Sequence, residues 1–269
     1  MYFGRRCVLF IEINQDLRAG FKLLPSIILL AWTSIKARYK RTYLGPLWTV
    51  LTVALGSLGI ALLWGFLFQM DFRTAIPHIT IGFMVWMFVT GTIVEGLTSF
   101  VSQAPTLQSM KMPICFFPLM AVTTNFIVFL HSIIVIFVIL LFFPPENPFT
   151  LFWFLPYSLL TLISLFFTSF ILAILNARYR DIGLLINGAL PILFFLSPVI
   201  FRIEHINPSL SWVVYVNPLS LYVFAMRDPF TGITLSPPVL TGFLLFAVAQ
   251  YFVLALLVKF KHKQIVYWI

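Results

Sequence analysis

The segment KARYKRTYLGPLWTVL, residues Lys36 to Leu51, decides how this chain is organised. Four cations fall within six residues at its start, and the run from Gly45 to Phe68 then carries no charge. As a helix that run is about 36 Å long, enough to cross a hydrocarbon core of about 30 Å with some tilt. Lys and Arg that flank a span stay on the cytoplasmic side. The segment therefore predicts a first transmembrane helix running outward from a cytoplasmic N-terminus.

The composition indicates a protein that crosses the membrane several times. Of its 269 residues, 61% are hydrophobic and 9% are charged, whereas about a quarter of a soluble domain is charged. The net charge is +9, but the cations gather at the ends of apolar runs rather than on one soluble surface. Membrane topology accounts for them, so we expect no nucleic-acid partner.

The N-terminal segment and the cysteines give no sign of a secreted chain. Polar and acidic residues interrupt the first forty residues where a signal peptide needs an apolar core. Cys7 and Cys115 both fall on the predicted cytoplasmic side, where thiols stay reduced. We expect neither a cleaved leader nor a disulfide.

The remaining apolar runs predict an all-α integral membrane protein with six spans. We place the spans at about 45–68, 79–101, 115–143, 149–175, 182–201 and 238–258. This layout puts fourteen Lys and Arg in cytoplasmic segments and three outside, which favours six spans with both ends in the cytoplasm. The predicted organisation is a cytoplasmic segment 1–44, a transmembrane domain 45–259 and a cytoplasmic tail 260–269.

The residues before the first span predict an amphipathic helix in the cytoplasmic interface. Between Leu23 and Arg41, apolar residues recur at spacings of three and four, with basic residues off that stripe. Such a helix is either a membrane-surface anchor or a docking surface for a cytoplasmic partner. The stripe consists of Leu24, Ile28, Ala31, Ile35 and Tyr39.

The segment between the fifth and sixth spans predicts two short re-entrant helices. Leu210 to Val216 and Leu219 to Met226 are apolar but only about 10 to 12 Å long as helices, too short to span. Asn-Pro pairs introduce both runs. Helices satisfy their own backbone groups in lipid, so both can dip into the outer leaflet. The alternative is a pair of helices lying on the outer surface.

Motifs for enzymatic chemistry are missing from the sequence. It holds no phosphate-binding loop of the form GxxxxGK[ST], and its four histidines are scattered without metal-ligand spacing. We expect no cofactor on this chain. Glu95, Asn125 and His131 are the polar residues of interest within spans. Glu95 is a helix-end anchor, a partner for a nearby cation or a proton relay. His131 is either an interhelical hydrogen-bonding residue or a ligand.

Motifs in fixed order resemble one family. They are RYKRTYLGPLW at the first span, Glu95-Gly96, Asn125 with His131, ARYRDIG, FFLSPVIF, NPL and MRDPFTG. Together they make the chain similar to the permease subunit of ABC-2 type exporters of cell-surface polysaccharides, such as O-antigen permeases. In one departure, the connection after the second span reads QAPTLQ where the family typically has an acid or Asn with Leu-Ile-Lys.

The resemblance implies an assembly and roles for particular residues. Two permeases pair around a channel, and two cytoplasmic ABC ATPase subunits, which carry ATP and Mg, bind below. Residues implied at the ATPase-coupling surface are Ile35, Lys36, Tyr39, Lys40, Gln103, Thr106, Gln108 and Lys111. Residues implied where a diphosphate headgroup enters are Arg38, Arg41, Arg178 and Arg180, with ordinary lipid contact as the alternative. Residues implied at a re-entrant outer gate are Trp212, Tyr215, Asn217, Pro218, Tyr222 and Phe224.

The implied function is ATP-driven export of a polyprenyl-diphosphate-linked polysaccharide. The chain would be the membrane subunit and not an enzyme, with hydrolysis on the partner. Teichoic acid or a capsular polysaccharide is the alternative cargo. An ATP-independent carrier or a membrane-embedded glycan-modifying enzyme is the alternative of another class.

Overall fold

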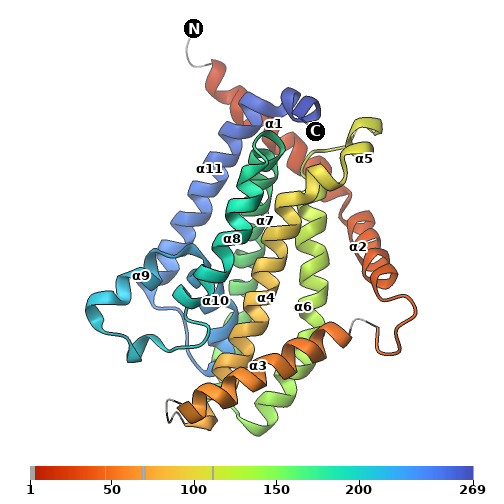
Figure 1. The fold of residues 1–269 in the computed structure, drawn as a ribbon. Helices are drawn as coiled ribbons and strands as arrows, with labels where there is room; N and C mark the ends of the chain where they lie inside the picture. Colours follow the sequence, from red (N-terminus) through yellow and green to blue (C-terminus); the bar gives the residue numbers. More distant parts are fainter. Residues whose placement is uncertain (1–3, 46, 68, 70, 111, 269) are drawn as a thin grey trace.

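A computed structural model describes residues 4–45, 47–67, 69, 71–110 and 112–268, with side chains for the same residues except 4–12, 49, 205, 208 and 260–267. Within these residues every regular element is a helix. Figure 1 shows upright helices with α1 (Gly4–Lys22), α5 (Ala104–Ser109) and the last turns of α11 (Pro237–Trp268) at one end, here called the terminus end. The turns joining α3 to α4 and α6 to α7 form the opposite, loop end.

Among the described residues, five helices are long and apolar enough to cross a membrane, and a sixth span results if α1 and α2 count as one bent segment. The five are α3 (Leu47–Leu67), α4 (Phe72–Ser102), α6 (Phe116–Phe142), α7 (Phe154–Arg178) with the 3₁₀ turn before it, and α11. These helices confirm a multi-pass helical membrane protein.

Helix α4 is the central element. Two-thirds of its most apolar window is buried, a larger share than in any other of the five helices. Gly96 allows α7 to approach closely, because a Cβ there would lie 2.4 Å from the Cβ of Ser169. Aromatic and branched residues of α4 then pack with α6, α7 and α10 (Pro218–Arg227) in the main core.

Two of the predicted spans differ in length from the helices that form. The predicted fifth span, 182–201, ends early: α8 (Asp181–Leu196) has 16 residues, about 24 Å by helical rise. The Ser197 hydroxyl bonds back to the Leu193 carbonyl and Pro198 follows, so the helix stops there. The predicted loop before the second span is largely helical, because the Asp71 carboxylate caps α4 by accepting from the Arg73 N–H at 3.0 Å.

The N-terminal region contains one helix that we did not predict and one that we did. Helix α1 has no counterpart in our expectation, whereas α2 (Leu24–Arg38) matches the predicted amphipathic helix. The two are bent by 62° at the break between them. Asp16 fixes α1 to the start of α6 by accepting hydrogen bonds from the N–H groups of Ile114 and Cys115, at 2.9 and 3.0 Å.

The buried face of α2 differs in part from our expectation. The helix runs alongside α6 (Figure 1), and its place in the cytoplasmic interface stays a prediction. Its buried stripe is Ile27, Ala31 and Ile35, whereas Ile28 is 46% exposed. The three buried residues are spaced four apart, and residues at that spacing lie on one face of a helix.

The segment between α8 and α11 contains the two short helices that the Asn-Pro pairs predict. They are α9 (Ser211–Val216) and α10. Every residue of α10 from Leu219 to Arg227 is buried, whereas much of α9 is exposed. The surface alternative is therefore wrong for α10, which packs against α4 and α7 inside the bundle. Its re-entrant course through the membrane stays a prediction.

Candidate functional site

Glu95 and Asn125 form a polar contact inside the bundle. The Asn125 amide donates to the Glu95 carboxylate at 2.6 Å and to the Ala121 carbonyl at 2.9 Å. The positive charge of Arg38, at the end of α2, attracts the Glu95 carboxylate. A cavity of about 170 Å³ beside Asn125 is lined by Arg38 and Tyr39 as well. The structure thus gathers two of the three predicted intramembrane residues and places the end of α2 next to them.

The third predicted residue, His131, lies in a different contact. Its Nδ1 donates to the Ile127 carbonyl at 2.7 Å, and its ring stacks on Trp32 of α2 with centroids 6.2 Å apart. The Lys36 ammonium lies 5.2 Å from the Trp32 ring centroid. The hydrogen bond lies within α6, and the contact of His131 with α2 is the ring stacking, so an interhelical hydrogen bond from His131 stays a prediction.

The four arginines predicted at a headgroup entry lie in two places. Arg38 borders the cavity beside Asn125, and the exposed Arg41 follows in the connection to α3. Arg178 and Arg180 lie in the turn between α7 and α8, at the terminus end. The Arg178 guanidinium lies 5.2 Å from the Trp268 ring centroid, which links this turn to the end of α11. The structure does not gather these arginines into one pocket.

The residues predicted to contact an ATPase also fall into two groups. The first group lies at or just beyond the C-terminal end of α2 and consists of Ile35, Lys36, Tyr39 and Lys40. The Ile35 side chain is on the buried face of α2. Gln103, Thr106 and Gln108 lie on or next to α5 at the terminus end, whereas Lys111 is outside the described residues. Ile27, near the start of α2, belongs to the same buried apolar cluster as Leu107 of α5. Contact with an ATPase stays a prediction.

The predicted outer-gate residues divide into buried and exposed groups. Asn217 caps α10: its side-chain oxygen accepts from the Leu219 N–H at 3.0 Å, and its amide donates to the Ser197 hydroxyl at 2.8 Å. Tyr222 and Phe224 are buried in α10. Trp212, Tyr215 and Pro218 are exposed on α9 and at the start of α10.

A buried hydroxyl network that we did not predict holds α10 in the bundle. The Tyr222 hydroxyl lies 3.0 Å from the hydroxyls of Ser164 and Thr168 on α7. Gln250 on α11 accepts from Ser164 at 2.5 Å and donates to Thr168 at 2.6 Å. Gln250, an amide within the apolar run of the last predicted span, is the one sequence signal that pointed to this network.

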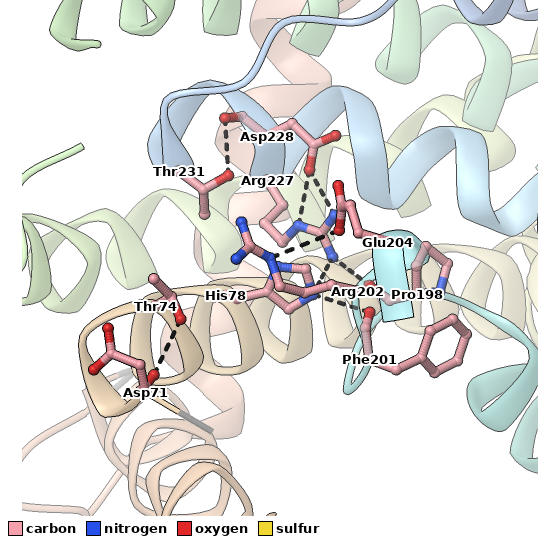
Figure 2. A network of polar contacts seen from close by, with 10 residues as sticks. All are labelled: Asp71, Thr74, His78, Pro198, Phe201, Arg202, Glu204, Arg227, Asp228 and Thr231. Atoms are coloured by element: carbon pink, nitrogen blue, oxygen red, sulfur yellow. Dashed lines mark hydrogen bonds and ion pairs between the residues drawn. The ribbon is translucent and has the colours of Figure 1, made fainter. Parts of the chain in front are cut away.

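A second cluster that we did not predict closes the loop end of α10 (Figure 2). The Arg227 guanidinium donates to the Asp228 carboxylate at 2.9 and 2.6 Å, contacts the His78 ring at 3.1 Å and bonds to the Pro198 carbonyl. His78 Nε2 also lies 3.1 Å from the Phe201 carbonyl. Burial raises the pKa of the Asp228 carboxyl, and Arg227 opposes that shift in part. The cluster ties α4, the end of α8 and α10 together.

A cavity of about 260 Å³ lies over this cluster. It is bounded by Arg202 and Glu204 on one side and by the rings of Tyr215 and Phe224 on another. In the described part of the chain, no three His, Cys, Asp or Glu residues are grouped in a way that could hold a metal ion. The arrangement can hold a polar ligand, but it lacks the constellation of a hydrolytic or metal-dependent active site.

Comparison with known proteins assigns the chain to a family. Residues 25–231 match the family model described as ABC-2 type transporter. Two proteins named O-antigen export system permease protein RfbA, from Klebsiella pneumoniae, are 26% and 25% identical; the matches cover 84% and 90% of this chain and 87% and 94% of theirs. A protein of the same name from Myxococcus xanthus is 26% identical over 72% of this chain and 75% of its own. Because the family model covers well over half of its length, this chain belongs to the ABC-2 type transporter family, as a transporter membrane subunit rather than an enzyme.

Proposed function

We propose that this chain is the membrane subunit of an ATP-driven exporter that moves polyprenyl-diphosphate-linked polysaccharide from the cytoplasmic to the outer face of a bacterial cytoplasmic membrane. The observation that carries the proposal is the match to O-antigen export permeases over most of both chains. The helical bundle supports it, because it provides several helices that are long and apolar enough to cross a membrane.

The energy for transport comes from a separate subunit in this proposal. The sequence contains no phosphate-binding loop, so ATP and Mg bind to a cytoplasmic ABC ATPase. Two copies of this chain and two of the ATPase form the working assembly. Helix α5, which holds part of the predicted coupling surface, lies at the terminus end (Figure 1) and would contact the ATPase there.

Export of a defined glycan tests the proposal. The chain is deleted in its host and restored on a plasmid, and surface polysaccharide and lipid-linked precursor are both measured. Deletion should remove the surface glycan and leave the lipid-linked precursor at the cytoplasmic face. A partner ATPase whose phosphate-binding Lys is replaced should give the same result, since hydrolysis then stops.

Two outcomes would redirect the proposal. Surface glycan that persists with the inactive ATPase would favour an ATP-independent carrier. Restoration of teichoic acid or capsule export in defined mutants, without restoration of O-antigen, would keep the mechanism and change the cargo.

A further inference from the structure

The cavity over the Arg227 cluster has the chemistry of a sugar site. Six of the residues that line the cavity have polar groups that can form hydrogen bonds or aromatic rings that can stack on a ligand. They are Arg202, Glu204, Tyr215, Phe224, Thr234 and Ser236. Its volume of about 260 Å³ is below the range of about 300–1,000 Å³ typical of sites for drug-sized ligands, so it suits a single sugar residue.

The floor of the cavity is fixed. Arg227 is 3% exposed and directs its guanidinium to Asp228, His78 and the Pro198 carbonyl (Figure 2). These contacts engage all three nitrogens of the guanidinium, and its charge is paired with that of Asp228. The buried cluster therefore shapes the cavity without attracting an anion into it.

The wall of the cavity supplies adaptable polar groups. Arg202 and Glu204 are paired loosely at 3.9 Å, and the Glu204 side chain is 67% exposed. Exposed pairs of this kind contribute little, so either partner can exchange its contact for a hydroxyl group at small cost. A carboxylate accepts from hydroxyls and a guanidinium donates to them, and together they suit a neutral polyol.

Aromatic faces complete the site. Tyr215 and Phe224 have ring centroids 6.3 Å apart and planes inclined by 39°. Tyr215 is 47% exposed, so its ring is accessible from the cavity mouth. The C–H face of a sugar ring packs on such a surface while its hydroxyls reach the polar wall.

Charge balance distinguishes this ligand from a phosphate. Within the lining, Arg227 is matched by Asp228 and Arg202 by Glu204. An anion site needs unmatched donors, whereas a neutral sugar needs donors and acceptors together. We infer that this cavity binds a neutral sugar residue of the exported glycan at the loop end of the bundle, the side that the predicted topology places outside. This inference rests on the proposed function.

The test is a binding measurement on the permease with its ATPase in nanodiscs. The probe is an oligosaccharide released from the host's polysaccharide by mild acid and freed of lipid and phosphate. Tyr215→Ala and Glu204→Gln should each weaken binding about tenfold, the effect of losing about 1.4 kcal/mol of contact. Phe152→Ala is the control, because Phe152 is an exposed ring between α6 and α7 that does not line the cavity.

Three results would overturn the inference. They are undetectable binding to the wild-type assembly, equal binding by Tyr215→Ala and wild type, and displacement of the oligosaccharide by inorganic pyrophosphate. Equal thermal unfolding of the variants and wild type confirms that they fold. Export by the wild-type assembly in the host is measured in parallel, so that a failed sugar site remains distinguishable from a failed transport function.

Discussion

The Asn125 amide donates a 2.6 Å hydrogen bond to the Glu95 carboxylate and thereby joins α6 to α4 inside the bundle. This contact gives an acid within a predicted span a structural partner. It also brings both residues near Arg38, at the end of the helix that precedes the first span. The contact gives Glu95 a hydrogen-bonded partner, and substitution of Glu95 tests the proton-relay alternative.

We predict that Glu95→Gln keeps export close to wild type, because a glutamine oxygen still accepts the Asn125 amide. Asn125→Leu should instead destabilise the bundle by about 1–3 kcal/mol, since it leaves the Glu95 carboxylate without this donor. Surface glycan and thermal unfolding in detergent measure the two effects. Loss of export from a well-folded Glu95→Gln protein would favour a proton relay.

The hydroxyl network predicts a second stability effect. Tyr222→Phe removes the hydroxyl that contacts Ser164 and Thr168 and should lower the free energy of unfolding by about 1–3 kcal/mol. Tyr215→Phe is the control, since that side chain is exposed and should shift unfolding little. Limited proteolysis would show whether α10 is released first. Equal stability of the two variants would contradict an anchoring role for Tyr222.

The Asp16 contact predicts the accessibility of a thiol. Cys115 is buried, and its Sγ donates to the Asp16 carbonyl at 3.2 Å. In a Cys7→Ser background, Asp16→Ala should let α1 detach and raise the rate of Cys115 labelling by maleimide at least several-fold. Arg18→Ala on the exposed side of α1 should leave the rate unchanged. Unchanged labelling in Asp16→Ala would mean that other contacts hold α1 in place.

Charge reversal at the basic segment predicts a loss of export without a loss of insertion. Arg38→Glu with Arg41→Glu places an acid near Glu95, and twelve Lys and Arg remain on the predicted cytoplasmic side to hold topology. Membrane fractionation and surface glycan are measured together. Normal export from the inserted variant would contradict a role for either arginine.

Local sequence signals predicted much of the helical framework. The apolar run of α6 and the turn between α7 and α8 follow from composition and charge. The start of α10 follows from Asn217-Pro218, because the amide caps the helix and proline suits its first position. These features depend on neighbours in the sequence, which is why a single chain reveals them.

Features that depend on distant contacts were not predicted. His78 and Arg227 are in contact although 149 positions separate them in the sequence, and no local sequence pattern predicts this contact. The Trp32 and His131 rings stack between α2 and α6, a contact that the sequence does not reveal. Amphipathicity placed Ala31 and Ile35 on the buried face but also placed Ile28 there, which is exposed. Ser197-Pro198 marks the end of α8, but the apolar run continues past these residues, so the span predicted from hydropathy was too long.

Co-purification of the chain from native membranes tests the central claim most directly. The tagged chain is solubilised, and the eluate is assayed for subunit composition and ATP hydrolysis, with and without lipid-linked glycan. We predict an ABC ATPase at a one-to-one ratio, with hydrolysis that responds to the glycan. A chain that purifies without an ATPase, yet supports glycan export in reconstituted vesicles, would contradict the account.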